Sequence, residues 1–174
     1  IMGLLEQDQG INYYTSPGIF QQVNMQTNTL LRKYIKDFIE KNKISSVLDL
    51  YCGSLNLSLG LLQPYRKVVA VESNNISMDV ARYNLKLNGL KACDIKLVNA
   101  KSLDYLKETD SSKGEFDAII LDPPRSGAKE EISYIANLKA KFIIYMSCDP
   151  MTLARDCGNI QDTYKVLDIC MYYF

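Results

Sequence analysis

The sequence has 174 residues, of which 47% are hydrophobic and 23% are charged. This length suits one domain with a core of its own, and the composition excludes a fibrous or an intrinsically disordered protein. Lys and Arg together number 20 and balance 20 Asp and Glu, which excludes a strongly basic nucleic-acid-binding arm. Histidine is absent. Chemistry must therefore rest on carboxylates, thiols, amides or a cofactor.

The five cysteines include no CxxC pair, a pattern typical of neither a disulfide framework nor a metal site. We therefore expect no metal, a reducing compartment and a cytoplasmic location. No apolar run approaches the roughly eighteen residues of a membrane span, and there is no signal-peptide pattern. The chain starts at Ile1 instead of a methionine, which favours a fragment of a longer protein.

The predicted elements alternate between helices and short apolar strands. An amphipathic helix is expected over residues 27–43, because apolar side chains recur there at helical spacing. Five strands follow, at residues 46–50, 67–71, 94–98, 116–121 and 142–146, and the clearest helix between them covers residues 75–88. A sixth strand near residues 164–172 is expected to close one edge. This order predicts an α/β fold with a central, mostly parallel sheet flanked by helices.

Ligands of such sheets bind beyond the carboxyl ends of the strands, so the residues that follow the strands are candidates. Gly53 allows a sharp turn and a close approach of backbone to ligand, although an ordinary turn explains it equally well. Glu72 ends the second strand, where a carboxylate either accepts hydrogen bonds from ribose hydroxyls or is simply solvated. Asn99 ends the third strand. It either contacts the edge of an adenine ring or is an ordinary turn residue.

The motif after the fourth strand is harder to explain as an ordinary loop. Its sequence is Asp122-Pro-Pro-Arg-Ser-Gly127. The rigid double proline fixes a carboxylate and the guanidinium of Arg125 at the edge of the sheet. We expect this motif to hold a planar ligand through hydrogen bonds.

The motif after the fifth strand carries a candidate nucleophile. Cys148 precedes an expected helix in which Asp149 is the N-cap and Pro150 the first residue. The partial positive charge of a helix N-terminus favours the nucleophilic thiolate form. The other cysteines are expected to be buried and inert, at positions 52, 93, 157 and 170.

Together these residues resemble the catalytic domain of the S-adenosylmethionine-dependent RNA 5-methyluridine methyltransferases, which methylate C5 of uracil in tRNA and 23S rRNA. The resemblance extends from Pro17 to Phe174, and its most specific parts are the motif at residues 122–127 and the run at residues 145–156. It implies a Rossmann-like class I methyltransferase fold, with residues 1–174 as a single catalytic domain. It also implies that the family's amino-terminal RNA-binding domain and carboxyl-terminal end lie outside this chain.

The resemblance implies a role for each candidate residue. The contacts to the methyl donor are Gln22, Tyr51, Gly53, Asn56, Glu72, Asn99 and Asp122. The catalytic residues are Cys148, the nucleophile that adds to C6 of uracil, and Asp122. Asp122 and Arg125 line the pocket for the base, with a phosphate or an acidic neighbour as the alternative partner of Arg125. The family's proton-abstracting glutamate falls after the position of Phe174. RNA is the implied partner, mainly through parts outside this chain. Because net charge is zero, we expect this segment alone to bind RNA weakly. We also expect the segment alone to be inactive.

Two residues depart from the family pattern. Leu55 stands where the glycine loop of the family has a second glycine, which predicts crowding at the methionine end of the donor. Asp149 replaces an asparagine, and a carboxylate beside Cys148 opposes formation of the thiolate.

Other functions stay open at this point. An RNA 5-methylcytosine methyltransferase is the nearest, although that family has a cysteine in the fourth-strand motif. Exocyclic-amine methyltransferases have an aromatic residue where Arg125 stands. Leu55 and Asp149 favour a donor-binding RNA scaffold that has lost catalysis. A nicotinamide-dependent oxidoreductase has the same sheet architecture, but no complete GxGxxG motif follows the first strand.

Overall fold

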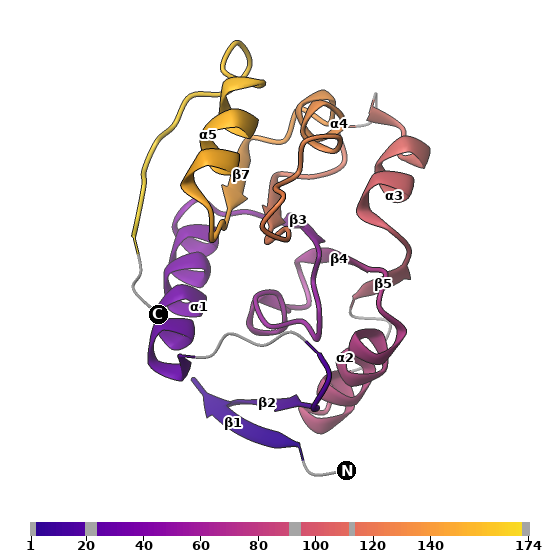
Figure 1. Cartoon of the computed structure of the whole chain (residues 1–174). Helices are drawn as coiled ribbons and strands as arrows, with labels where there is room; N and C mark the ends of the chain where they lie inside the picture. Colours follow the sequence, from indigo (N-terminus) through magenta and orange to yellow (C-terminus); the bar gives the residue numbers. More distant parts are fainter. Residues whose placement is uncertain (1–2, 20–23, 91–94, 112–113, 172–174) are drawn as a thin grey trace.

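The computed structural model describes residues 3–19, 24–90, 95–111 and 114–171. A hairpin consists of β1 (Leu4–Asp8) and β2 (Ile11–Thr15). The main sheet consists of β3 (Ser46–Leu50), β4 (Lys67–Glu72), β5 (Lys96–Asn99), β6 (Ala118–Leu121) and β7 (Phe142–Tyr145). The helices are α1 (Met25–Lys41), the 3-10 helix η1 (Leu59–Leu61), α2 (Asn75–Leu87), α3 (Ser102–Glu108), α4 (Ile132–Asn137) and α5 (Pro150–Gly158). Figure 1 shows the hairpin at one end of the molecule, across from α4 and α5.

The main sheet has the order β5-β4-β3-β6-β7, and every neighbouring pair is parallel. This confirms the expected α/β architecture and all five expected strands, with shifts at their ends. The chain builds outward from β3 through β4 to β5, then returns to the other side of β3 to add β6 and β7. Such a reversal places the topological switch point between β3 and β6, where ligands of these folds bind.

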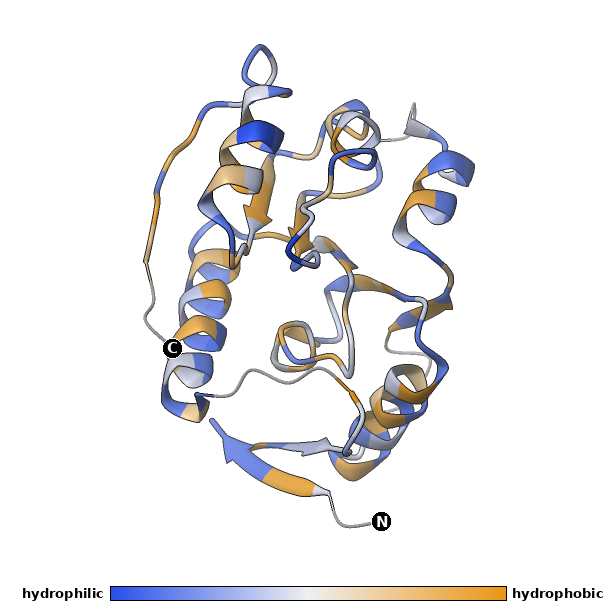
Figure 2. Ribbon diagram, viewed as in Figure 1, coloured by the Kyte–Doolittle hydropathy of each residue, from blue (hydrophilic) through white to orange (hydrophobic). Residues whose placement is uncertain are grey.

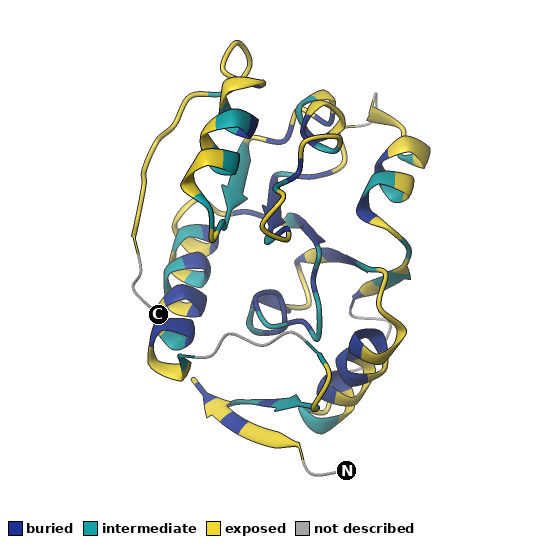
Figure 3. Cartoon of the chain, in the orientation of Figure 1, coloured by how far each residue is buried: buried dark blue, intermediate teal, exposed yellow. Residues whose placement is uncertain are grey.

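The main sheet separates two apolar layers, because successive residues of a strand face opposite sides. Val47, Ala70 and Ile120 pack on the side covered by α1, η1 and α2. Leu48 and Ile119 pack on the side covered by α3 and α4. The central strands β3, β4 and β6 are accordingly largely apolar in Figure 2 and buried in Figure 3, whereas the outer strands β5 and β7 are partly exposed. Burial on both faces explains why the central strands have nearly continuous apolar sequences.

The first helix starts two residues before its expected start because a side chain caps it. Asn24 Oδ1 accepts a hydrogen bond from Thr27 N at 3.1 Å, which satisfies a free donor of the first turn. Asn74 does the same for α2 through Ser77 N at 3.0 Å.

The sixth strand is wrong for residues 164–171, and Tyr172 lies outside the described residues. This segment makes no strand and runs as an extended chain past α5 toward α1 (Figure 1). Its apolar side chains at positions 166, 167, 169 and 171 are exposed, because none of the described strands pairs with it. Tyr34 fastens it to α1, donating a hydrogen bond from Oη to Asp168 Oδ2 at 2.6 Å. The expected burial of Cys170 is wrong for the same reason.

Across the described residues, no helix combines the length and the apolar character needed to cross a membrane. In the same part of the chain, no three His, Cys, Asp or Glu side chains gather in a group that could hold a metal ion.

Candidate functional site

Most candidate residues come together at the carboxyl edge of the parallel sheet. Glu72 and Asn99 are direct neighbours across β4 and β5. Tyr51 follows β3 and Asp122 follows β6, two strands that pair through Leu50 and Leu121. Cys148 lies beyond β7, between that strand and α5. Gln22 lies outside the described residues.

The glycine loop, residues 51–56, has an uncommon backbone. Tyr51, Gly53 and Leu55 have φ values of 62°, 55° and 71°. Such values suit glycine and cost other residues conformational energy. A Cβ atom at Gly53 would meet no atom within 4 Å, and the Gly53 N–H donates to Glu72 Oε2 at 3.1 Å. At Gly53 the backbone of the loop is therefore accessible to a ligand, and the Glu72 carboxylate lies beside it.

The side chain of Tyr51 is anchored by a hydrogen bond to the start of α4. Its hydroxyl donates a hydrogen bond to Glu131 Oε1 at 2.8 Å. Burial, followed by this contact with the carboxylate, raises the pKa of Tyr51. The hydroxyl therefore stays protonated near neutral pH, and the ring is a fixed wall of the glycine loop.

The two apolar side chains of the glycine loop point into the protein. Leu55 is fully buried and belongs to the core layer under α1, so its side chain packs in the interior instead of projecting from the loop. Cys52 is also buried, as expected, and burial raises the pKa of its thiol well above the ordinary value. Thiolate chemistry is thereby confined to other cysteines.

Asp49, near the end of β3, is a buried carboxyl group that the sequence did not single out. It is 1% exposed, and its Oδ2 has no hydrogen-bond partner among the described residues. Burial raises its pKa to about 7, and the negative charges of Asp122 and Glu72 add to the effect. The strand ends thus form a site rich in negative charge, which favours a cationic ligand.

Asp49→Asn is expected to remove a pH dependence of stability. An unfolded Asp ionises near pH ~4, whereas the folded protein keeps this proton up to about pH 7. The folded state therefore binds more protons in this interval, so its free energy of unfolding falls as pH rises. The variant cannot ionise and should gain stability relative to the unaltered protein across the interval. Urea unfolding at about pH 4 and about pH 8 measures this difference.

The matched control is Asp79→Asn, because Asp79 is 78% exposed on α2. It should shift stability by a similar small amount at both pH values. A stability difference for Asp49→Asn that is the same at both pH values would contradict the assignment.

Asn56 and Asn99 are both engaged with neighbouring side chains. Asn56 exchanges two hydrogen bonds with Asn28, at 2.9 and 3.0 Å, and accepts another from Arg32 Nη2 at 2.6 Å. Asn99 donates to Asn75 Oδ1. Their roles as donor contacts stay predictions.

The loop after β6 is fastened to α5 through Asp156, which is fully buried. Its Oδ2 accepts hydrogen bonds from Ala128 N and Tyr145 Oη, both at 2.7 Å. Its Oδ1 accepts from Arg155 Nε at 2.8 Å, and Arg155 Nη2 donates onward to Ser126 O at 2.8 Å. This cluster joins the loop that follows Asp122 to the helix that follows Cys148.

Gly127 explains how this loop comes so close to α5. Its φ is 75°, and a Cβ atom there would lie 2.5 Å from Asp156 Oδ2 and 2.6 Å from Arg155 Nη2. Only glycine fits both the backbone conformation and the space. Arg125, two residues earlier, is exposed.

Cys148 is exposed, and the helix after it begins as expected. Asp149 caps α5: its Oδ1 accepts from Met151 N at 2.8 Å and Thr152 N at 3.1 Å. The carboxylate of Asp149 is therefore engaged by the first turn of the helix. Its expected effect on the Cys148 thiolate stays a prediction.

Several residues that shape this site could not be identified from sequence patterns. Arg32, Asn84 and Glu131 act through contacts with residues far along the chain, which no local periodicity reveals. Asp156 lies within the run 145–156 that carries the resemblance, and its burial became visible only in the structure.

Comparison with known proteins places the chain among RNA methyltransferases. The 23S rRNA (uracil(1939)-C(5))-methyltransferase of Colwellia psychrerythraea is 38% identical over 159 residues, which are 91% of this chain and 34% of that protein. The Acinetobacter baylyi protein of the same name is 39% identical over 151 residues, 85% of this chain and 32% of that protein. The chain thus spans about a third of the length of these relatives.

Among solved structures, the Pyrococcus abyssi tRNA (uracil-54, C5)-methyltransferase in complex with S-adenosyl-L-homocysteine matches with a TM-score of 0.75 and 26% identity, over 90% of this chain and 37% of that chain. This match confirms the Rossmann-like methyltransferase fold. The sequence profile of the tRNA (uracil-5-)-methyltransferase family covers residues 3–173. The chain therefore belongs to the tRNA (uracil-5-)-methyltransferase family.

Proposed function

We propose that residues 1–174 form the catalytic domain of an RNA uracil-C5 methyltransferase that uses S-adenosylmethionine. The observation that carries this proposal is the placement of an exposed Cys148 at the N-terminus of α5, which Asp156 fastens to the loop that follows Asp122. A nucleophile and a carboxylate thus flank one edge of the sheet. The 23S rRNA methyltransferase relatives support a uridine of ribosomal RNA as the target, and the P. abyssi enzyme supports tRNA as the alternative.

The strand ends fit the methyl donor. Open backbone at Gly53 permits close approach, and the Glu72 carboxylate beside it has lone pairs left for ribose hydroxyls. Asn99 lies next to Glu72, and Tyr51 supplies an aromatic wall. The carboxylates of Glu72 and Asp122, which lie near the buried Asp49, give this site a negative potential that suits the cationic donor. When bound, S-adenosylmethionine supplies an electrophilic methyl group.

The chemistry assigned to this chain's residues begins at Cys148. Its thiolate attacks C6 of uracil, forming an S–C6 bond and moving the C5–C6 π electrons toward C5 and O4. C5 thereby becomes nucleophilic enough to accept the methyl group. A base then removes the C5 proton, and the freed electron pair restores the C5–C6 double bond and expels the thiolate.

The uracil ring must leave its stack to reach Cys148, at a cost of a few kcal/mol. Asp122 and Arg125 belong to the loop that is fastened to α5, and we assign them to the pocket for the turned-out base. Arg125 is exposed and able to donate paired hydrogen bonds to the base or to a phosphate. Most of the RNA affinity is assigned to parts of the protein outside this chain.

RNA that contains 5-fluorouridine tests the proposal, because fluorine at C5 cannot leave as a cation and the covalent adduct accumulates. The full-length protein is incubated with this RNA and S-adenosylmethionine. We expect an adduct that survives a denaturing gel and maps by peptide mass to Cys148. Nucleoside analysis of ordinary RNA should show 5-methyluridine.

Each other outcome selects a different function. Formation of 5-methylcytidine would overturn the choice of base. Donor binding without methyl transfer would favour the RNA scaffold, and binding of NAD in place of the donor would favour an oxidoreductase. Formation of 5-methyluridine without an adduct would remove the covalent step from the proposal.

A further inference from the structure

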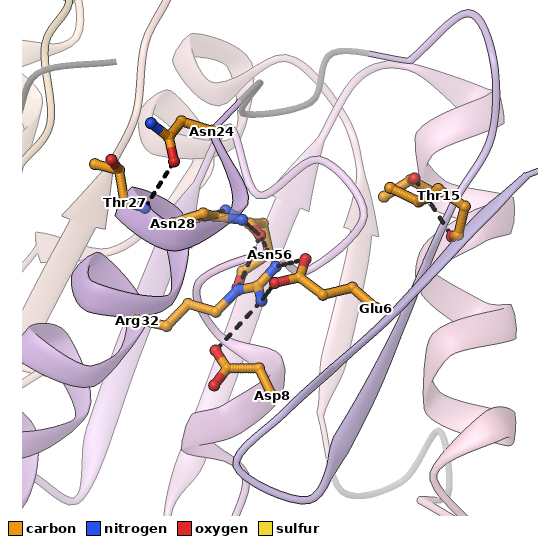
Figure 4. A network of polar contacts seen from close by, with 9 residues as sticks. Glu6, Asp8, Thr15, Asn24, Thr27, Asn28, Arg32 and Asn56 are labelled. Carbon is orange, nitrogen blue, oxygen red and sulfur yellow. Dashed lines mark hydrogen bonds and ion pairs between the residues drawn. The ribbon is translucent and has the colours of Figure 1, made fainter.

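The β1–β2 hairpin meets helix α1 through buried charges. Glu6 and Asp8 of β1 approach Arg32 of α1, with Glu6 Oε1 at 3.0 Å and Asp8 Oδ2 at 3.4 Å from Arg32 Nη1. All three side chains are at least nine-tenths buried. The Arg32 guanidinium also lies over the Tyr13 ring of β2, 3.7 Å from its centroid. Figure 4 shows this guanidinium between the hairpin and the glycine loop.

The same guanidinium reaches the glycine loop on its other side. Arg32 Nη2 donates to Asn56 Oδ1 at 2.6 Å, and Arg32 Nε donates to the Asn56 backbone oxygen at 3.1 Å. Asn28, one turn earlier on α1, completes the set through its two hydrogen bonds with Asn56 (Figure 4). One side chain thus joins β1, α1 and the end of the glycine loop.

A second contact joins the hairpin to the middle of the same loop. Asn84 of α2 pairs with the edge of β2, accepting from Tyr14 N at 2.7 Å and donating to Tyr14 O at 3.1 Å. Its amide nitrogen also donates to Ser54 O at 3.0 Å. Asn84 is 1% exposed, so these hydrogen bonds form without competition from bulk water. The glycine loop is therefore fixed at Ser54 and at Asn56, each time in contact with the hairpin.

The contacts of Arg32 and Asn84 both stabilise the glycine loop, which has a strained backbone. Two of its non-glycine residues, Tyr51 and Leu55, have positive φ values, which persist only where the surroundings hold them. Buried charges are tolerated only when their hydrogen bonds are complete, so the Arg32 cluster favours a single arrangement of hairpin, helix and loop. The position of the hairpin and the shape of the loop are thereby coupled.

We propose that Arg32 and Asn84 are positioning residues that use the β1–β2 hairpin to set the shape of the glycine loop and hence the affinity for the methyl donor. Neither residue needs to touch the donor. This inference rests on the proposed function, because it takes the glycine loop as part of the donor site.

The test measures donor affinity by calorimetry with S-adenosylhomocysteine on the full-length protein. Arg32→Lys keeps the charge but loses the paired donors, and we expect the Kd to rise about tenfold, the equivalent of one charge-assisted hydrogen bond. Glu6→Gln changes only the hairpin side of the cluster and should raise the Kd by a smaller factor. In the double variant the two effects should not multiply, because both act through one cluster.

The matched control is Lys33→Gln, which removes an exposed ion pair with Asp37 from the adjacent position of α1. Its Kd should stay within about twofold of the unaltered value. A role in folding alone would lower the thermal midpoint without changing the Kd of the protein that remains folded. Asn84→Ser supplies a second, independent variant should Arg32→Lys not fold.

The outcomes separate this inference from the proposed function. If the unaltered protein binds S-adenosylhomocysteine and folded Arg32→Lys or Asn84→Ser binds it equally well, the positioning role is overturned while the proposed function stands. If the unaltered protein does not bind the ligand, the donor site itself is overturned, and this inference with it. Loss of affinity in Arg32→Lys and Glu6→Gln, but not in Lys33→Gln, supports the positioning role.

Discussion

Cys148→Ala is expected to lower the rate of uridine methylation by about 10⁴-fold or more, because removal of a covalent nucleophile abolishes the main reaction path. Donor affinity should stay within about twofold, since Cys148 lies after β7, whereas Gly53 and Glu72 lie after β3 and at the end of β4. Single-turnover transfer of labelled methyl groups to RNA by the full-length protein measures the rate.

Cys170→Ala is the matched control, because Cys170 is the other exposed cysteine among the described residues and lies in the extended segment after α5 instead of at a strand end. It should keep full activity. A Cys148→Ala protein that methylates RNA at a rate within about tenfold of the unaltered protein would exclude Cys148 as the nucleophile.

Asp156→Ala is expected to lower the free energy of unfolding by about 3 kcal/mol, because several donors lose their acceptor in a buried place. Ala128 N, Tyr145 Oη and Arg155 all bond to this carboxylate, which is 0% exposed. Urea unfolding of the variant and the unaltered protein measures the loss. Methyl transfer by the protein that remains folded should also slow, because the loop after Asp122 is released from α5.

Asp79→Ala serves as the control for Asp156→Ala, since the exposed pair of Asp79 with Arg82 contributes at most about 0.5 kcal/mol. Equal losses in the two variants would show that the buried carboxylate does not hold the loop.

The main sheet was predictable because its central strands β3, β4 and β6 are buried on both faces. Runs such as Ala118–Leu121 are wholly apolar. Because these strands alternate with helices along the chain, the sequence predicts a parallel sheet. The same topology made Glu72, Asn99 and Asp122 predictable as neighbours, because parallel strands bring their carboxyl ends to one edge. Gly53 and Cys148 follow from the same rule.

The hairpin and the sixth strand were not predictable in this way. The inward residues of β1 are Glu6 and Asp8, so its pattern of apolar and polar residues is inverted and gives no strand signal. Residues 164–171 have a strand-like composition, yet strand propensity is realised only when a neighbour pairs with it. For β1 the deciding partner is Arg32 of α1, far along the sequence, whereas none of the described strands supplies a partner for residues 164–171.

The role of Leu55 could also not be predicted from the sequence. A leucine in place of glycine suggested crowding of the donor, because the direction of its side chain is unknown from the sequence alone. In the structure its positive φ of 71° turns the side chain into the core, where it is fully buried. Burial of a leucine side chain contributes roughly 1.5–3 kcal/mol, enough to offset the cost of the backbone conformation.

Asn84 of α2 and Asn88, the residue that follows this helix, also affect association between molecules. The free edge of a two-stranded hairpin presents unpaired N–H and C=O groups that invite another strand, and this is a common start of aggregation. Here Asn88 bonds both backbone groups of Asn12, at 2.8 and 2.7 Å, and Asn84 does the same for Tyr14. Two side chains thus complete the hydrogen bonding of β2 as a third strand would, and they close that edge to intermolecular pairing.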